Sequence, residues 1–312
     1  MNIEDGHSLQ EISSDANLTA DQSADEKTDG ASAKITPQLS PPGNYPIRKL
    51  GDRGLGIVIC NVNFVSPFRR RNAASADIDN MSRLFHKMGL RVETYSNLSG
   101  PEMKHSIAKY SDRDLSCYDC LFLAVSTHGD RGTLIGTDGV PVSIESSVLS
   151  PFNGARCPSL CGKPKVFFLQ ACRGGEKDFC LKLPENETDG NGAGEQAIRL
   201  IERIRDLFSG ASQAEAVLVP TELDFFIAYS TVPGYVSWRN TEKGSWFMYA
   251  LFECYMAYGN EVHLAELMTY VTDYVATYFS DTDKETKRIA KQVVCYESRL
   301  SKFLKVAADR PE

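Results

Sequence analysis

Short runs of consecutive apolar residues, separated by longer amphipathic stretches, constrain this fold more than any other feature of the sequence. These runs occur at 56–60, 121–125, 166–169, 225–229 and 293–296. Strands that are apolar throughout, with no alternation of polar and apolar residues, are typical of sheets buried on both faces. We therefore expect an α/β fold, a three-layer sandwich whose mostly parallel central sheet is covered by helices on both faces.

The stretches between the runs carry helix signals. Apolar residues recur at helical spacing in three stretches: 78–88, 246–258 and 264–278. Gly89 and Gly259 follow the first two, where a glycine often closes a helix. Ser99 and Glu102 form a capping-box signature that predicts a fourth helix, running to Lys109.

The first 45 residues differ in composition from the rest of the chain. They hold eight acidic and two basic side chains, a net −6 of the formal −7, and no aromatic residue precedes Tyr45. Such a segment cannot bury enough surface to offset its ordering entropy, so 1–45 is predicted to be a disordered acidic leader. The remaining body is near neutral and has no basic stripe, which argues against nucleic acid as a partner.

Targeting and cysteine usage point to a reducing compartment. No apolar run approaches the roughly 18–20 residues of a membrane span, and the acidic leader is not a signal peptide, so we expect a cytoplasmic protein. Nine cysteines, an odd number, favour free thiols over a disulfide framework. Cys117 with Cys120, and Cys157 with Cys161, have spacings that could suggest zinc. Because Cys120 opens an apolar run and no third motif completes the set, we interpret these cysteines as structural and expect no metal or organic cofactor.

Two of the apolar runs lead into reactive side chains. The run 121–125 is followed by Ser-Thr-His-Gly-Asp, which contains His128, and the run 166–169 by Gln-Ala-Cys-Arg-Gly, which contains Cys172. Because ligands gather at the carboxyl ends of parallel strands, we expect the imidazole and the thiol to meet at one edge of the sheet. A thiolate is the reactive form of cysteine, and a nearby imidazole stabilises it and can later protonate a leaving amine.

These two motifs, together with 235–240 (Tyr-Val-Ser-Trp-Arg-Asn) and 244–247 (Gly-Ser-Trp-Phe), resemble those of the caspases, which are aspartate-specific cysteine proteases. The resemblance extends over residues 45–305. It implies Cys172 as the nucleophile, His128 as the general acid and base, and an oxyanion hole made by the backbone N–H groups of Cys172 and Gly129. Glycine suits position 129 because a side chain would crowd the approaching carbonyl.

The resemblance also implies a first substrate pocket that selects aspartate. The implied substrate-binding residues are Arg71, Gln170, Val236, Ser237, Trp238, Arg239 and Trp246. A guanidinium in a desolvated pocket pairs bidentately with a short carboxylate, and a substrate lacking that group leaves the buried charge unpaired at a cost of several kcal/mol. Val236 stands where many caspases carry an aromatic residue, so the second pocket should admit a bulkier side chain.

The second pocket arginine comes, by resemblance, from the loop after the first strand. That loop reads Arg-Arg-Arg-Asn-Ala-Ala-Ser-Ala-Asp from 69 to 77, and the family pattern is stretched there by about two residues. Arg71 is our choice and Arg70 is the open alternative.

Two Asp-Gly steps resemble caspase processing sites. Asp189 precedes Gly190 in a polar loop, and Asp29 precedes Gly30 in the leader. The resemblance thus implies a zymogen with a prodomain (1–45), a large subunit (46–189), an intersubunit linker (190–219) and a small subunit (220–312). Within the linker, 195–208 places apolar residues on one helical face. This segment could cover a surface of the precursor, bind a partner or be lost on activation, and the choice stays open.

The short leader favours an executioner-like enzyme of apoptosis that another protease activates. The implied partners are protein substrates with aspartate before the cleaved bond, a second copy of the processed chain, and inhibitor-of-apoptosis proteins. A metacaspase-like or legumain-like enzyme is one alternative, but Gln170 and Arg239 argue against a pocket for basic residues. A catalytically silent caspase-like regulator that acts by heterodimerisation is the other; such proteins usually lose the cysteine or the histidine, and this chain keeps both.

Overall fold

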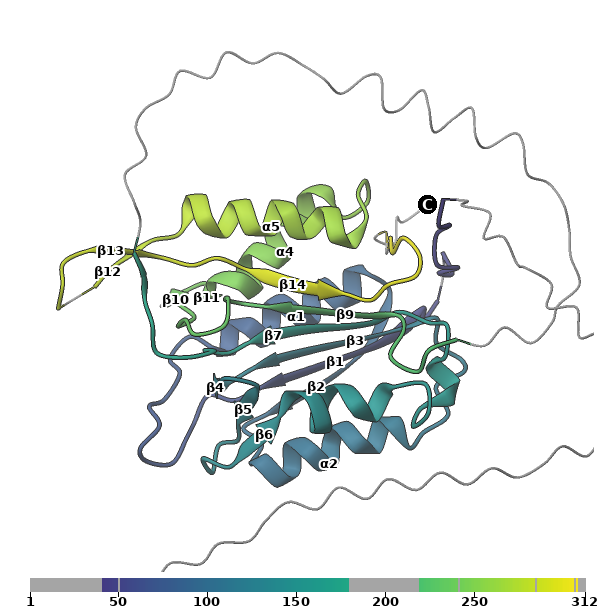
Figure 1. Ribbon diagram of the computed structural model, residues 1–312, viewed down its shortest axis with the longest axis horizontal. Helices are drawn as coiled ribbons and strands as arrows, with labels where there is room; N and C mark the ends of the chain where they lie inside the picture. Colours follow the sequence, from purple (N-terminus) through teal and green to yellow (C-terminus); the bar gives the residue numbers. More distant parts are fainter. Residues whose placement is uncertain are drawn as a thin grey trace, which may run out of the picture. The chain divides into compact units, whose positions relative to one another are not determined.

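Within the described residues, a six-stranded sheet forms the centre of the fold (Figure 1). The structure is a computed structural model and describes residues 41–49, 51–179, 219–240, 242–283, 285–305 and 307. The spatial order of the strands is β14, β9, β7, β3, β1, β2. Their bounds are β1 Gly54–Cys60, β2 Leu90–Ser96, β3 Cys120–Ser126, β7 Lys165–Gln170, β9 Phe225–Tyr229 and β14 Cys295–Ser298. All neighbours run parallel except β14 and β9, so the predicted mostly parallel sheet is confirmed.

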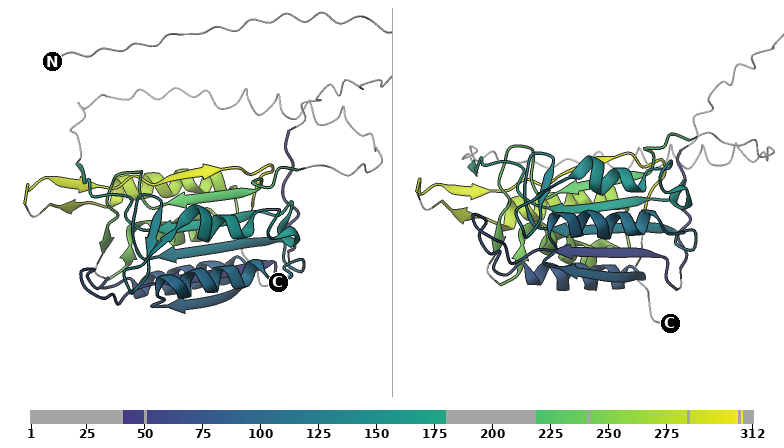
Figure 2. Two further views of the ribbon diagram at one scale, coloured as in Figure 1. Left: turned by 60° about the horizontal axis from the view of Figure 1, so that its bottom comes forward. Right: turned by 90° about the horizontal axis from the view of Figure 1, so that it is seen from below.

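Helices cover both faces of this sheet, as predicted. Helices α1 (Ser75–Lys87), α4 (Trp246–Tyr258) and α5 (Leu264–Tyr278) lie on one face (Figures 1 and 2). Helix α2 (Gly100–Ser111) lies on the other, with short helical turns at Ile144–Leu149, Ser150–Phe152 and Pro158–Leu160. None of the helices in the described part of the chain is long and apolar enough to cross a membrane.

The apolar strands supply two cores at once because successive side chains point to opposite faces. In β3, Phe122 and Ala124 join the cluster under α1, α4 and α5, whereas Leu121, Leu123 and Val125 join the cluster under α2. All seven residues of β3 are buried, which is why the strand reads as an unbroken apolar run.

The helix ends follow the predicted signals. The side chain of Ser99 accepts a hydrogen bond from the Glu102 N–H, and the Glu102 carboxylate accepts from the Ser99 N–H, which completes the capping box of α2. Gly89, just beyond α1, has a φ of +69°, a left-handed conformation that favours glycine. Gly259 caps the C-terminus of α4.

Three small sheets surround the carboxyl ends of the central strands. One contains β4 His128–Asp130, β5 Thr133–Ile135 and β6 Pro141–Ser143; another pairs β10 Arg239–Asn240 with β11 Gly244–Ser245; the third contains β8 Asp178–Phe179, β12 Asp281–Thr282 and β13 Ile289–Lys291. They fix the loops that carry the predicted site residues.

The sequence prediction and the structure differ at the two edges of the sheet. The last strand begins at Cys295, two residues later than predicted, and β2 was not predicted at all. Both are edge strands with several exposed residues, so neither shows the uniform apolar pattern of the central strands. Asp29, Asp189, the segment 195–208 and nearly all of the leader and linker lie outside the described residues.

Candidate active site

The ends of β3 and β7 bring the two predicted catalytic residues to the same level of the sheet. The strands are parallel with Ser126 opposite Gln170, and the Thr127 N–H donates to the Gln170 carbonyl at 3.0 Å. His128 and Cys172 each lie two residues beyond this pair, at the carboxyl ends where ligands of such sheets collect. The predicted juxtaposition therefore follows from strand register.

The surroundings of His128 set both its tautomer and its charge. Its Nε2 lies 2.8 Å from the Arg69 carbonyl, which can only accept, so the neutral ring carries its proton on Nε2 and keeps a lone pair on Nδ1. The rings of Phe64 and Phe68 pack against the imidazole, with centroids 4.6 and 5.5 Å away. Burial lowers the pKa of His128, the bond to Arg69 opposes this, and two neighbouring arginines lower the pKa further. The result is a neutral imidazole whose Nδ1 can take up a proton.

Only glycine fits at position 129. A Cβ there would lie 2.7 Å from the Thr133 carbonyl, 2.8 Å from the Ala171 Cβ and 3.0 Å from the Cys172 carbonyl. Gly129 therefore permits the close approach of the histidine-bearing and cysteine-bearing segments. A steric reason for this glycine was expected from the sequence, and the contacts responsible are with the Thr133 carbonyl first, and then with Ala171 and the Cys172 carbonyl.

The Cys172 thiol is half-buried against the segment after β9. The Ser237 N–H lies 3.4 Å from its Sγ, and the Ser237 carbonyl lies 4.0 Å away. Gln170, at the end of β7, donates through its Nε2 to the Ser237 hydroxyl. The nucleophile is thus placed between the strand that bears it and the segment predicted to bind substrate.

Arg71 is fully buried, whereas Arg70 is exposed. Its Nη1 donates to the Asn61 carbonyl and its Nη2 to the Ser126 hydroxyl, both at 2.8 Å. Its Nε has no hydrogen-bond partner among the described residues. Of the two arginines considered, Arg71 is the buried one and has one donor left free, while its role in binding substrate stays a prediction.

Arg239 and Gln170 bring further polar groups to this region that have no direct carboxylate partner among the described residues. Arg239 is mostly buried, and within the described residues it makes no hydrogen bond or ion pair with a carboxylate. Burial, followed by repulsion from Arg71, lowers the pKa of Arg239 to about 10. The Oε1 atom of buried Gln170 also lacks a partner in the described part of the chain. A ligand carboxylate would satisfy both guanidinium groups.

Comparisons with known proteins identify the family of this chain. The caspase-domain family model matches residues 53–305. This chain belongs to the caspase family. A caspase-1 of Spodoptera frugiperda is 35% identical over 255 residues, which cover 81% of this chain and 78% of the relative. A caspase-7 of Gallus gallus is 34% identical over 282 residues, covering 86% and 81%. The crystal structure of the Spodoptera frugiperda caspase-1 matches with a TM-score of 0.72 and 30% identity, covering 88% of this chain and 97% of that one.

A stack of aromatic rings lies next to Ser237 and Arg239. Trp238 stacks on Trp246 with ring centroids 5.9 Å apart, and Trp246 stacks on Phe279 at 5.2 Å. Gln292 holds Trp238 in place, because its Oε1 accepts from the Trp238 N–H at 2.7 Å. Val236 is half-buried, and its N–H donates to the Glu176 carbonyl at 2.8 Å. Of the seven predicted substrate-binding residues, Ser237 contacts the thiol directly, Gln170 contacts Ser237, and Arg239 lies within electrostatic range of both Cys172 and Arg71. The substrate-binding roles of all seven stay predictions.

Sequence reasoning missed the carboxylate that organises this caspase site. Asp77 is 1% exposed; it accepts from the Ser245 N–H at 2.7 Å, from the Ser245 hydroxyl at 2.6 Å and from the Ser126 hydroxyl. Ser126 in turn accepts from Arg71, so a relay links the negative charge to the pocket cation. The sequence did show an acidic residue at the start of the helix, six residues after Arg71. An acid at that position is usually explained by its favourable interaction with the helix dipole, so it did not indicate a role in the site.

The cysteines considered as zinc ligands do not form such a set. Cys120 and Cys157 are buried in opposite core clusters, whereas Cys117 and Cys161 are exposed. In the described ranges, no group of three or more His, Cys, Asp or Glu side chains could hold a metal ion.

Proposed function

We propose that this protein is a cysteine endopeptidase that cleaves proteins after aspartate. The observation that carries the proposal is that the fully buried guanidinium of Arg71 and the partly buried one of Arg239 lie close enough to repel each other, with no carboxylate in direct contact with either among the described residues. Gln170 adds a free polar atom to the same pocket. Membership in a family of cysteine peptidases supports the reaction type.

The proposed reaction uses the groups at the ends of β3 and β7. His128 takes the thiol proton on Nδ1. The Cys172 thiolate then attacks the backbone carbonyl carbon of the bound aspartate residue. The backbone N–H groups of Cys172 and Gly129 are assigned to the oxyanion. The imidazolium then protonates the leaving amine, and water, deprotonated by His128, hydrolyses the thioester.

The pocket charges explain why aspartate is the proposed preference. An uncharged residue would leave the Arg239 guanidinium desolvated and without a carboxylate partner, and breaking one side of a buried ion pair costs about 3–5 kcal/mol. This cost corresponds to a preference for aspartate over an uncharged residue of at least about a hundredfold in kcat/KM. The aromatic cleft next to the pocket supplies apolar contacts for the preceding residues, and Val236 leaves room for a large one.

We further propose the biology that the caspase resemblance supports. The chain would be a zymogen of apoptosis with a prodomain (1–45), a large subunit (46–189), a linker (190–219) and a small subunit (220–312). Another protease would cut after Asp189 and after Asp29. The processed protein would act in the cytoplasm as a dimer in which β14, at the edge of the described sheet, pairs with its twofold mate. Inhibitor-of-apoptosis proteins remain proposed partners.

The test of the proposed activity uses an acetyl-tetrapeptide that ends in aspartate and carries a fluorogenic leaving group. Wild-type protein should cleave it, and Cys172→Ala should keep the same thermal unfolding midpoint but lose turnover by at least about a thousandfold. Cys161→Ala, an exposed cysteine, is the matched control and should retain activity. Turnover of Cys172→Ala near the wild-type level would refute the nucleophile.

The proposed processing is tested separately. Asp189→Ala should leave the precursor uncut after exposure to an active caspase, whereas Asp178→Ala, in β8, should not prevent cleavage. Intact-mass spectrometry reads the products. Separation of the chain after residue 189 in the Asp189→Ala variant would refute this site.

A further inference from the structure

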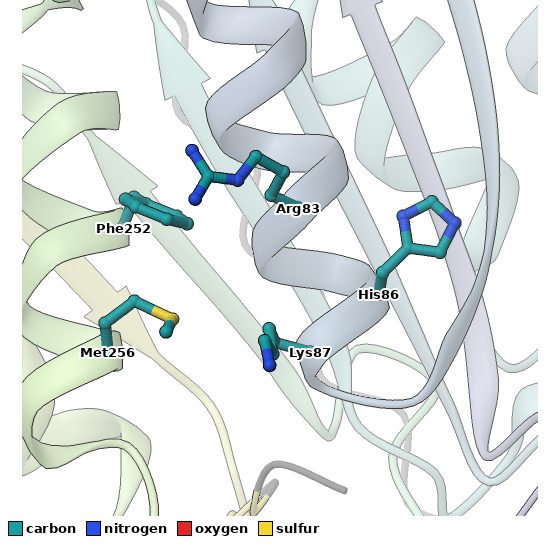
Figure 3. Close-up of a pocket in the computed structure, with 5 residues that line it drawn as sticks. All are labelled: Arg83, His86, Lys87, Phe252 and Met256. Carbon is teal, nitrogen blue, oxygen red and sulfur yellow. The ribbon is translucent and has the colours of Figure 1, made fainter.

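A hollow of about 480 Å³ lies between α1 and α4, outside the proposed catalytic cleft (Figure 3). Its lining residues are Arg83, His86 and Lys87 from α1, and Phe252 and Met256 from α4. Figure 3 shows Arg83 and Lys87 facing the two apolar side chains across the gap between the helices, with His86 on the flank of α1. The volume falls within the range of ligand-binding pockets, roughly 300–1,000 Å³.

The α4 side of the hollow is apolar and partly open to water. Met256 is 49% exposed, although a methionine is usually buried. Phe252 is 7% exposed, and the Arg83 guanidinium lies over its ring, 4.7 Å from the centroid. An exposed, flexible thioether next to an aromatic ring is a common feature of surfaces that accept apolar side chains.

The α1 side of the hollow is positively charged. Neither Arg83 nor Lys87 forms an ion pair with any residue that the structure describes, and no acidic residue lines the hollow. Glu253, the acidic neighbour of Phe252, lines a separate hollow between α4 and α5. Cations in the last turn of a helix interact favourably with its carbonyl end, but this accounts for Lys87 and not for Arg83 or the exposed Met256.

The spacing of the lining residues favours a polypeptide ligand. Arg83 and Lys87 are four residues apart on α1, and Phe252 and Met256 are four residues apart on α4. Each pair forms a row about 6 Å long, one row cationic and the other apolar. An amphipathic helix with acidic and apolar side chains at the same spacing presents two matching rows.

We propose that this hollow is a docking site for an acidic, amphipathic helical segment of a partner protein. Apolar side chains of the segment contact Phe252 and Met256, and its carboxylates pair with Arg83 and Lys87. The site goes beyond the proposed protease activity and does not depend on it. Arg83, the lining residue of α1 nearest to Asp77, lies six residues after it, about 9 Å along the helix axis, so the two sites are separate along α1.

The probe is a fluorescein-labelled peptide of about 14 residues, four helical turns, in which Glu and Leu each recur every fourth residue in an alanine background. Its counterpart has Gln in place of every Glu. Fluorescence anisotropy with the full chain should show saturable binding of the Glu peptide that weakens as NaCl is raised. The Gln counterpart should bind about tenfold more weakly, because each exposed ion pair contributes a few-fold in affinity.

Variants identify where the probe binds. The double change Arg83→Gln with Lys87→Gln should weaken binding about tenfold, and Met256→Glu should weaken it at least as much. The matched control, Lys104→Gln with Lys109→Gln, makes the same charge change on α2 at the other face of the sheet, so its affinity should stay within about twofold. Circular dichroism melting verifies that each variant is folded, and hydrogen exchange should show probe-dependent protection at 83–87 and 252–256.

Four results would overturn the proposal. The first is no saturable binding at millimolar peptide, which means a binding free energy weaker than about −4 kcal/mol; the second is equal affinity for the Glu and Gln peptides. The third is unchanged affinity in the Arg83 and Lys87 double variant, and the fourth is loss of binding when a tetrapeptide aldehyde ending in aspartate occupies the catalytic cleft. Retained binding with the aldehyde bound places the probe outside that cleft. Loss of cleavage in Cys172→Ala with retained probe binding separates this proposal from the protease activity.

Discussion

Replacing Arg239 with Leu should make the protein more stable and much less active. Within the described residues, Arg239 makes no hydrogen bond or ion pair that its removal would break. Burial and repulsion from Arg71 lower its pKa from the ordinary 12.5 to about 10. Because one pH unit corresponds to about 1.4 kcal/mol, the charged form is disfavoured in the folded protein by about 3 kcal/mol.

The sign of this effect follows from linkage. A cation whose pKa is lowered on folding destabilises the folded state at every pH below the folded-state value, which includes neutral pH. Removal of the charge relieves the penalty, while loss of the packed stem opposes the gain. A net gain of about 1–2 kcal/mol is expected, a rise in the unfolding midpoint of about 2–8 °C for a domain of this size.

Activity should change in the opposite direction. The substrate carboxylate loses one of its two guanidinium partners, and a broken buried pair costs about 3–5 kcal/mol, so kcat/KM for aspartate substrates should fall at least about a hundredfold. The ratio of kcat/KM for tetrapeptides ending in aspartate and in asparagine should fall with it. Arg70→Leu, which removes an exposed cation from a nearby loop, should leave both measurements nearly unchanged.

Calorimetry and fluorogenic kinetics on the same preparations decide the outcome. A loss of stability of 2 kcal/mol or more in Arg239→Leu would show that the guanidinium is already satisfied in the free protein. An unchanged ratio of aspartate to asparagine cleavage would place the specificity pocket elsewhere. Either result refutes the reasoning from an unpaired buried cation.

Three further changes test other parts of the site. Gly129→Ala should cut kcat at least about tenfold and destabilise the protein by about 1–3 kcal/mol, because its Cβ would press on the Thr133 carbonyl and on the Ala171–Cys172 segment. Kinetics and denaturant unfolding measure this, and wild-type behaviour would contradict the packing. Phe64→Ala should expose the imidazole of His128 and raise its pKa toward the ordinary 6.5. The acid limb of the pH profile of kcat/KM should therefore move to higher pH than in the wild type. A shift to lower pH would mean that burial is not the main cause of the lowered pKa of His128. Asp77→Asn should lower the free energy of unfolding by about 3 kcal/mol, because the charge of Arg71 loses its compensation and a Ser245 donor faces an amide. Equal stability of the variant and the wild type in urea unfolding would show that the relay does not stabilise the fold.

The sequence predicted those parts of the fold that depend on local pattern. The central strands are buried on both faces and are therefore apolar at every position, and the capping box at Ser99 depends on residues three apart in the chain. The edge strand β2 escaped prediction because one side of it faces water, which leaves only part of the apolar pattern.

The placement of His128 and Cys172 at neighbouring strand ends was predictable from the sequence, but the contacts that support them were not. His128 and Cys172 follow apolar strands and sit in recognisable motifs. The choice between Arg70 and Arg71 could not be made from consecutive arginines in an irregular loop, because burial alone distinguishes them. The contact between Asp77 and Ser245 joins residues 168 apart in the chain, and no pattern near either residue encodes it.

The most direct test of the account is a crystal structure of the processed protein with an acetyl-tetrapeptide aldehyde that ends in aspartate. The account predicts a covalent bond between the aldehyde carbon and the Cys172 Sγ. It also predicts the aspartate carboxylate within hydrogen-bond distance, about 2.7–3.2 Å, of the Arg71 Nε and the Arg239 guanidinium. An aldehyde bound to another residue, or a carboxylate that points into solvent away from both arginines, would contradict it.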